Sequence, residues 1–375
     1  MNGPRPIAFY APLKSPDDPS PSGDRTMARL LLKALREAGF PPIVASHLRT
    51  HDKAGDGTRQ EQARRDSFAE AERLIAHFRD LPEDERPILW FTYHVYYKAP
   101  DWIGPLVAGA LDIPYVVAEG SRAAKRADGP WSLGHKGAEE ALDRADVVFS
   151  MTDRDRPALE QARPRHQKLV ELPPFIDEAE WSAPRPQPRR LEVTPRLLAV
   201  AMMRHGDKLE SYRILAEALT LLRHLPWSLD IVGDGEARAE VEAHFAPFTS
   251  RTRFHGMCDT DRLRDLYGRA DLLVWPAVNE AYGMVLLEAQ LFGNAVVAGD
   301  YGGVRSVVKS GETGILAPPG DVGAFARSAG TLIRDAIARR RMGEAARTFV
   351  HQERNLAQAA ARLSDALVPL TGRGA

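Results

Sequence analysis

The chain has 375 residues, a length that favours two domains over one. Hydrophobic residues make up 44% of it and charged residues 27%, as in soluble globular proteins, and the net charge of -1 gives no basis for a nucleic-acid partner. The single cysteine, Cys258, excludes an internal disulfide framework and a cysteine metal cluster, and it fits a reducing cytoplasm. The sequence shows neither a signal-peptide core nor an apolar run of about 18 residues, so we expect no membrane span.

The first half of the chain alternates predicted strands with predicted helices. Short apolar runs predict strands at 6–11, 43–46, 88–92, 115–118 and 147–151. Apolar residues at helical spacing predict helices at 25–38, 69–79, 102–111 and 134–144. Residues 12–22 read as a loop, and the charged stretch 49–65 as a loop or an exposed helix. Strands that alternate with helices predict a parallel sheet.

A stretch rich in proline and arginine, residues 182–196, is the predicted linker to a second domain. The alternation resumes after it. Strands are predicted at 197–201, 229–232, 253–255, 272–275, 295–298 and 315–318. Helices are predicted at 211–222, 236–244, 322–337 and 342–366, with one more between the strands that begin at 272 and 295.

The stretch 270–303 carries the strongest pattern in the chain, a strand, a loop, a helix and a further strand. Asn279 offers a helix N-cap, and Gly283 allows a close approach of the backbone to a ligand. The free N–H groups at the start of a helix form an anion site, here next to the carboxylates of Glu280 and Glu288. Carboxylates accept hydrogen bonds from hydroxyl groups. The arrangement therefore suits a ligand with a diphosphate between two polyols.

The segment NEAYGMVLLEAQLFGNAVVAGDYGG, with seven residues between Glu280 and Glu288, resembles the E-x7-E element of retaining GT-B glycosyltransferases of the family 4 (glycosyl transferases group 1) type. At three places the sequence departs from the usual residues of the family, and these places bear on which donor sugar is bound. Ala277 stands where the family usually has serine, Ala281-Tyr282 replaces Gly-Phe, and Arg305-Ser306 occupies the place of a frequent carboxylate.

The resemblance implies an α/β fold of two Rossmann-like, doubly wound domains that face each other across a cleft. Residues 1–181 would bind the acceptor, 182–196 would link the domains, and 197–355 would bind the nucleotide sugar. The helix in 356–375 would cross back to the first domain. The expected reaction is retaining transfer of a hexose from a UDP- or GDP-linked donor, as in polysaccharide or glycoconjugate biosynthesis.

The resemblance also implies the residues of the donor site. Arg204 and Lys208 match the cations that stabilise charge on the leaving diphosphate without a metal. Glu280 would bind hydroxyls of the transferred sugar, and Glu288 the ribose. The residues expected to offer backbone groups to the phosphates and the base are Gly283, Met284, Val285, Gly233, Gly256, Met257 and Cys258.

In the first domain, His94 matches the histidine that faces the donor sugar, and its expected role is positioning. Gly23 matches a glycine-rich loop near the diphosphate, and Glu119 and Ser121 are candidate acceptor contacts. In a front-face mechanism the β-phosphate oxygen of the donor takes the acceptor proton. No cofactor is expected beyond the nucleoside diphosphate sugar, which is a co-substrate.

The acceptor is expected to be a carbohydrate, a glycolipid or a small molecule with a hydroxyl group. Residues 1–180 carry 25 Lys and Arg against 29 Asp and Glu, and this lack of basic bias favours a soluble acceptor over one in a membrane. A local patch around Arg122, Lys125 and Arg126 leaves peripheral membrane contact open.

Three other classes compete with a transferase. One is a GT-B epimerase or phosphorylase, although we find no pyridoxal-phosphate lysine site. The second is a dehydrogenase, which is disfavoured because Arg238 stands where the third glycine of G-x-G-x-x-G belongs. The third is a non-catalytic nucleotide-sugar-binding protein.

Overall fold

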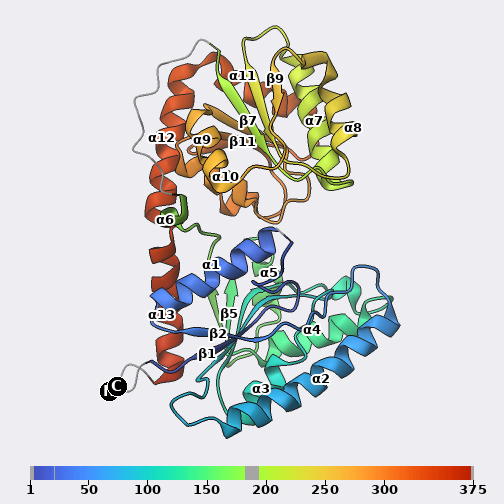
Figure 1. The fold of residues 1–375 in the computed structure, drawn as a ribbon, viewed down its shortest axis with the longest axis vertical. Coiled ribbons are helices and arrows are strands. Elements are labelled where there is room, and N and C mark those ends of the chain that lie inside the picture. Colours follow the sequence, from blue (N-terminus) through green and yellow to red (C-terminus); the bar gives the residue numbers. More distant parts are fainter. Residues whose placement is uncertain (1–3, 21, 182–193, 373–375) are drawn as a thin grey trace. The chain divides into compact units, whose positions relative to one another are not determined.

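A computed structural model describes residues 4–20, 22–181 and 194–372 of the chain (Figure 1). The chain divides into two compact units, Met1–Pro173 with Leu356–Ala375, and Pro174–Asn355. Residues 174–181, which the sequence analysis assigned to the first domain, group with the second unit. Trp181 packs edge-on against Tyr267 and Phe292 of that unit. Within the predicted linker, residues 182–193 lie outside the described residues.

The first unit is a six-stranded parallel sheet in the order β2-β1-β3-β4-β5-β6. Its strands are β1 (Ile7–Tyr10), β2 (Pro42–Ser46), β3 (Trp90–Val95), β4 (Tyr115–Gly120), β5 (Val147–Ser150) and β6 (Lys168–Glu171). Its helices are α1 (Gly23–Glu37), α2 (Gly57–Asp80), α3 (Gly104–Leu111), α4 (Ser132–Arg144), α5 (Arg156–Gln161) and α13 (Leu356–Thr371), with the 3-10 turn η1 (Ala124–Arg126). The last helix, α13, packs against α1.

The second unit is also a six-stranded parallel sheet, in the order β12-β11-β10-β7-β8-β9. Its strands are β7 (Arg196–Val200), β8 (Ser228–Val232), β9 (Thr252–Phe254), β10 (Leu272–Trp275), β11 (Ala295–Gly299) and β12 (Gly314–Ala317). Its helices are α6 (Glu178–Trp181), α7 (Asp207–Leu221), α8 (Arg238–Phe245), α9 (Thr260–Arg269), α10 (Met284–Leu291), α11 (Val322–Arg334) and α12 (Ala336–Glu353). The turns η2 (Ala246–Phe248) and η3 (Val304–Ser306) complete it.

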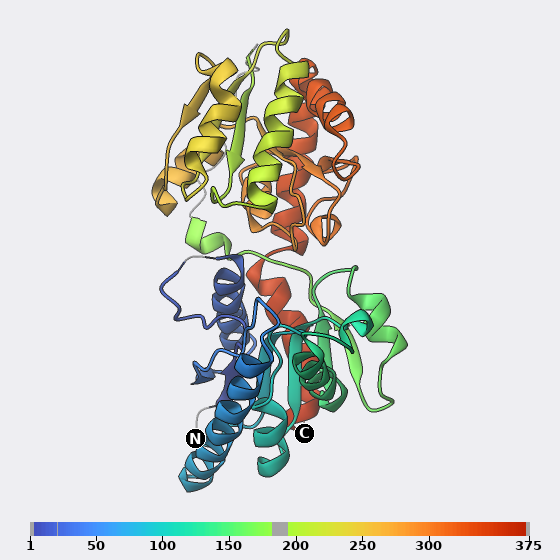
Figure 2. The same ribbon diagram turned by 90° about the vertical axis from the view of Figure 1, so that its right-hand side faces the viewer.

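The central strands form the cores of both units. Every residue of β1, β4, β5, β10 and β11 is buried, as expected of parallel strands covered by helices on both faces (Figure 2). These are the same apolar runs that predicted strands from the sequence. The α/β fold with two parallel sheets is therefore confirmed.

The structure decides one open assignment and corrects another. The charged stretch 49–65 is in part helical, because α2 begins at Gly57, where the Asp56 side chain accepts the N–H groups of Thr58 and Arg59. The helices predicted at 322–337 and 342–366 are three helices. Asp335 has an extended backbone and caps α12 through the N–H groups of Ile337 and Ala338. An aspartate that competes for backbone N–H groups ends one helix and starts the next.

Two glycines in helices of the second unit provide a matched test of its packing. A Cβ on Gly343 of α12 would lie 2.1 Å from the carbonyl oxygen of Gly293, whereas a Cβ on Gly268 of α9 would meet no heavy atom within 4 Å. We expect Gly343→Ala to lower the free energy of unfolding by about 1–3 kcal/mol through overpacking. Gly268→Ala should be neutral or stabilising by up to about 1 kcal/mol. Denaturant unfolding of both variants measures this, and equal midpoints would contradict the packing described.

Candidate functional site

The strand order of the second unit determines where the predicted donor residues lie. β7 and β10 are neighbours at the centre of the sheet, and the chain winds away from them in opposite directions. Ligands of open α/β sheets bind outside the carboxyl ends of strands at such a reversal. Arg204 and Lys208 follow β7, and Glu280 follows β10. The fold therefore brings these three residues to one edge of one sheet.

Lys208 and Glu280 form an ion pair at this edge. The ammonium of Lys208, in the first turn of α7, contacts Oε2 of Glu280 in the loop after β10. The indole N–H of Trp275 donates to the same oxygen at 3.4 Å, and Lys208 Nζ lies 5.6 Å from the centre of the Trp275 ring. The two paired side chains keep 30% and 18% of their surface exposed. The pair is thus held within the second unit and remains accessible.

Arg204 adds a second cation in the loop between β7 and α7. Its side chain is exposed and makes no hydrogen bond or ion pair with the residues that the structure describes. Its backbone carbonyl accepts the N–H of Leu209 at 3.0 Å, which joins the loop to the start of α7. The guanidinium is therefore free to bind an anion.

Asn279 does not cap the helix that follows it, so that prediction is wrong. The helix α10 begins at Met284, after Gly283, and Asn279 lies in the preceding loop with a positive φ of 49°. Its side-chain amide donates to Oδ1 of Asp207 at 2.9 Å. Asn279 instead ties the loop after β10 to the first turn of α7, which also carries Lys208.

Two of the predicted backbone sites require glycine on steric grounds. Gly233 has φ 139°, and a Cβ there would lie 1.8 Å from the carbonyl oxygen of Ala201. Gly283 has φ 74° at the start of α10, where the first N–H groups, including those of Met284 and Val285, have no acceptor within the helix. Those N–H groups can therefore bind an anion next to Glu280.

Glu288 lies in the second turn of α10 and accepts a hydrogen bond from the Tyr267 hydroxyl at 2.7 Å. Burial raises the pKa of Glu288 to about 7, and the hydrogen bond from Tyr267 only partly opposes the rise. The carboxyl group already binds one hydroxyl, which is the interaction expected of it with a ribose. Sequence reasoning did not identify Tyr267, because the polar helix α9 that carries it was not predicted.

The loop expected to bind the base follows the edge strand β9. The carbonyl of Gly256 accepts the N–H of Gly233 at 2.9 Å, so two predicted backbone sites are bonded to each other. Met257 is 57% exposed, and the thiol of Cys258 lies 3.9 Å from the Gly256 carbonyl. The exposed methionine gives this loop an apolar surface at the same edge of the sheet.

In the first unit, His94 is the last residue but one of β3 and lies close to two carboxylates. Its Nδ1 lies 3.2 Å from Oδ1 of Asp24 and 4.0 Å from Oε2 of Glu119. Burial alone would lower the pKa of His94, but the charges of Glu119 and Asp24 outweigh it and raise the pKa to about 9. The imidazole is therefore protonated at neutral pH. The sequence analysis gave no role to Asp24.

Glu119 is the last residue but one of the neighbouring strand β4, and it is buried, with 8% of its surface exposed. Its Oε2 has no hydrogen-bond partner among the described residues, and burial raises the pKa of its carboxyl group. Ser121 comes next but one in the chain, and its N–H donates to the Val95 carbonyl at 3.0 Å. The structure therefore brings His94, Glu119 and Ser121 to one edge of the first sheet.

Gly23 lies in the first turn of α1 rather than in a loop. Ser22 caps this helix by accepting the N–H of Arg25, and a Cβ on Gly23 would meet no heavy atom within 4 Å. Within the first unit, nothing steric requires glycine at this position. Asp24, the next residue, is the one that reaches His94.

Metal-binding clusters and membrane-spanning helices are both absent from residues 4–20, 22–181 and 194–372. Within those ranges, no group of three or more His, Cys, Asp or Glu side chains is placed to hold a metal ion. Among the same residues, no helix combines the length and the apolar character that a membrane span needs.

Comparison with known proteins identifies the type of domain in the second unit. Residues 197–349 match the family model described as Glycosyl transferases group 1. A D-inositol 3-phosphate glycosyltransferase of Kineococcus radiotolerans is 30% identical over 285 residues, which are 67% of this chain and 65% of that protein. The equivalent protein of Salinispora tropica is 34% identical over 161 residues, 40% of this chain and 33% of its own length. The chain thus spans less than two thirds of these relatives.

The fold is shared along the whole chain with solved structures. Sucrose-phosphate synthase from Thermosynechococcus elongatus matches with a TM-score of 0.73 and 18% identity over 99% of this chain and 100% of that one. A structure of Anabaena Alr3699/HepE in complex with UDP matches with a TM-score of 0.71 and 16% identity over 97% and 100%. These matches confirm the predicted GT-B type of fold. The family model and the relatives that match are those of glycosyltransferases, the class predicted from the sequence.

The buried carboxyl group of Glu288 generates a prediction about pH. Its pKa of about 7 lies above the ordinary value of 4.5, so its contribution to stability is present below pH 4.5 and is lost as the pH rises through 7. We expect Glu288→Gln, which keeps an acceptor for Tyr267, to be more stable than the wild type at pH 8 by about 2–3 kcal/mol. At pH 4.5 the two should be equal.

Thermal unfolding at pH 4.5, 6 and 8 measures the difference. Glu312→Gln, at an exposed position of the same unit, controls for the loss of a carboxylate. Parallel stability curves for the wild type and Glu288→Gln would show that Glu288 is not buried as described.

Proposed function

We propose that this protein is a retaining glycosyltransferase that moves a hexose from a UDP- or GDP-linked donor to a hydroxyl acceptor without a metal ion. One observation carries the proposal. The Lys208–Glu280 pair lies beside the start of α10, at the reversal of the second sheet, and Arg204 precedes Lys208 in the loop after β7. Two cations and a helix N-terminus for a diphosphate, next to a carboxylate for sugar hydroxyls, match the two parts of such a donor.

The donor site acts mainly through charge. Negative charge grows on the diphosphate as the bond from its β-phosphate oxygen to the sugar breaks, and Lys208 and Arg204 stabilise it. The diphosphate competes with Glu280 for the Lys208 ammonium. Glu280 is then available to accept hydrogen bonds from the sugar. Glu288 binds a ribose hydroxyl in the same manner as it binds Tyr267.

The first unit supports a front-face mechanism because His94 is protonated at neutral pH and cannot take a proton there. The leaving β-phosphate oxygen accepts the proton of the acceptor hydroxyl instead. The acceptor oxygen bonds to the anomeric carbon on the face from which the diphosphate departs, so the configuration is retained. Asp24 holds Nδ1 of His94, which leaves its Nε2–H to donate to a sugar oxygen.

The relatives and the structural neighbours guide the choice of substrates. Relatives are named D-inositol 3-phosphate glycosyltransferase, and structural neighbours contain UDP or UDP-glucose. UDP-hexoses are therefore the first donors to test, and a polyol or sugar is the first acceptor.

The residues after β8 argue against a dehydrogenase. Arg238 pairs with Asp234 and Glu242, so a charged side chain, and not a glycine, lies beside the Gly233–Gly235 turn. The free thiol of Cys258 fits a cytoplasmic location.

The proposal is tested by incubating the protein with UDP- and GDP-hexoses, with inositol phosphates and simple sugars as acceptors, and with EDTA throughout. We expect release of the nucleoside diphosphate and an α-configured product from an α-linked donor. Nucleotide binding without release would identify a binding protein, and a free epimerised donor would identify an epimerase. Loss of all activity in EDTA, restored by Mg²⁺, would contradict the metal-free mechanism.

Lys208→Ala should lower turnover by about a hundredfold or more, since groups that stabilise developing charge contribute on the order of 3 kcal/mol. The second unit holds a matched control. Lys309 pairs with Glu353 at 2.6 Å and lies 4.7 Å from the Phe349 ring, so it has the same kinds of partner as Lys208. Lys309→Ala should leave turnover unchanged. Steady-state kinetics with a saturating donor decide, and equal effects of the two substitutions would remove Lys208 from the donor site.

Calorimetric titration with the nucleoside diphosphate product separates the two glutamates. Glu288→Gln should weaken product binding, because the ribose contact is the same in the product and in the donor. Glu280→Gln should spare product binding and lower turnover, because the contacts of the moving sugar change in the transition state. The titration is best done at pH 8, where Glu288 is ionised. An equal loss of product binding in both variants would overturn the assignment.

A further inference from the structure

A polar cavity of about 530 Å³ lies in the second unit, away from the donor residues. Its walls come from the residues at which three neighbouring parallel strands begin, Arg196 of β7, Ser228 of β8 and Thr252 of β9, and from α9. Arg204, Lys208 and Glu280 follow the opposite, carboxyl ends of the strands, and the cavity reaches the loop after β9 at His255, next to Gly256. The cavity is therefore a separate site, and an inference about it does not depend on the proposed function.

Five arginines line the cavity: Arg196, Arg251, Arg253, Arg262 and Arg269. Arg262 and Arg269 share one carboxylate, that of Asp265, at 3.2 and 2.9 Å. Two positive charges thus face one negative charge there.

The other charged groups of the cavity leave an excess of positive charge. Arg251 donates to the backbone carbonyls of Arg223 and Leu225, which carry no charge. The carboxylate of Asp230 lies 2.6 Å from the ring of His255. The exposed side chains of Arg196 and Arg253 have no hydrogen-bond or ion-pair partner among the residues that the structure describes.

Asp271 is a further carboxylate close to this end of the sheet. It accepts the backbone N–H of Arg196, and not its guanidinium, at 2.8 Å.

Hydroxyl groups complete the lining. Thr249, Ser250 and Thr252 face the cavity, and Oγ1 of Thr252 is buried with no hydrogen-bond partner in the described part of the chain. Guanidinium groups that line one cavity repel one another. An anion in the cavity relieves this repulsion, because the planar guanidinium of arginine donates to two oxygens of a phosphate at once.

We propose that this cavity binds a small phosphorylated molecule with at least two phosphate groups. Its volume lies in the range of about 300–1,000 Å³ that ligand pockets occupy, which is more room than one phosphate group fills. The cavity also carries more positive charge than a single negative charge neutralises. A polyphosphate or a bisphosphate ester satisfies the volume, the charge and the hydroxyl donors together.

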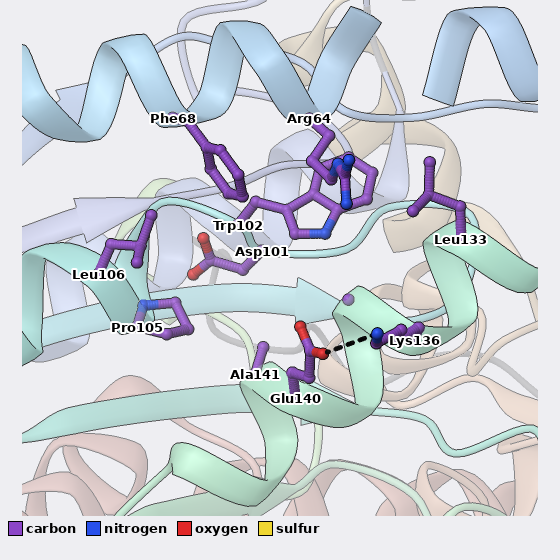
Figure 3. A pocket seen from close by; sticks show the side chains of 11 residues that line it. Arg64, Phe68, Asp101, Trp102, Pro105, Leu106, Leu133, Lys136, Glu140 and Ala141 are labelled. Carbon is purple, nitrogen blue, oxygen red and sulfur yellow. Dashed lines mark ion pairs between the residues drawn. The ribbon is translucent and has the colours of Figure 1, made fainter. Parts of the chain in front are cut away.

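The first unit offers a contrast. A cavity of about 170 Å³ lies between α2, α3 and α4, where Figure 3 shows Phe68, Trp102, Leu106 and Leu133 along its walls. Its lysine, Lys136, lies 3.9 Å from Glu140 on the same helix. Its arginine, Arg64, lies 3.1 Å from Glu61. This smaller cavity therefore presents apolar surface and two neutralised cations, and it lacks the charge that a polyanion requires.

The test is calorimetric titration of the full chain with inorganic tripolyphosphate at low salt. Arg196→Ala/Arg253→Ala should weaken binding by at least tenfold. Arg334→Ala/Arg341→Ala, which removes two exposed arginines elsewhere in the second unit, should leave the dissociation constant unchanged. Arg204→Ala/Lys208→Ala should still bind tripolyphosphate in the cavity, since those two residues belong to the donor site. Arg196→Lys/Arg253→Lys keeps the positive charge but loses the planar guanidinium groups. Its dissociation constant should therefore be intermediate.

The proposal is overturned if the wild type does not bind tripolyphosphate. It is equally overturned if the Arg196→Ala/Arg253→Ala protein, shown to be folded by its thermal unfolding, binds as well as the wild type. Loss of binding only in Arg204→Ala/Lys208→Ala would assign the heat to the donor site. A single-stranded oligonucleotide that binds the wild type more tightly than tripolyphosphate, with the same dependence on Arg196 and Arg253, would replace the small ligand by a nucleic acid.

Discussion

The winding order of two parallel sheets is the constraint on which the rest of this structure depends. In each unit the chain starts near the middle of the sheet and then adds strands on both sides, so that β1 and β3, and likewise β7 and β10, are neighbours whose loops diverge. Lys208 and Glu280 are 72 positions apart in the chain, and they meet because they follow such a pair of strands. His94 and Asp24 meet for the same reason, since α1 follows β1 and His94 is the last residue but one of β3.

Backbone strain is concentrated at the same sheet edges. In the described part of the chain, five residues other than glycine have a positive φ: His94, Asp112, Glu119, Ala277 and Asn279. Four of them lie at or just after the carboxyl end of β3, β4 or β10. A left-handed conformation costs about 1 kcal/mol or more for such residues and persists only where packing imposes it. Here it turns His94 and Glu119 towards each other and shapes the loop that carries Glu280.

The parts of this structure that were predictable from sequence follow from local patterns. Apolar runs identified all the central strands, because parallel strands are buried on both faces. The missed residues depend on tertiary packing. Asp24 looks like an ordinary acid in a first helical turn, and only the fold brings His94 to it. Tyr267 is an exception, because the short helix α9 that carries it has Leu263, Leu266 and, at its C-cap, Ala270 at helical spacing, and the sequence analysis did not use this pattern. Asn279 has the chemistry of a cap, yet Gly283, which adopts φ 74°, sets the helix start four residues later.

The two units differ in the charge that they present at the carboxyl edges of their sheets. In the first unit, protonated His94 is balanced by Asp24, and burial raises the pKa of the Glu119 carboxyl group beside it. Such a cluster offers hydrogen-bond donors without net positive charge, which suits sugar hydroxyls. In the second unit, Arg204 is unpaired within the described residues, and Lys208 is neutralised only by Glu280. A diphosphate gains more there, because its charge replaces that of Glu280 at the ammonium and still has Arg204 to bind.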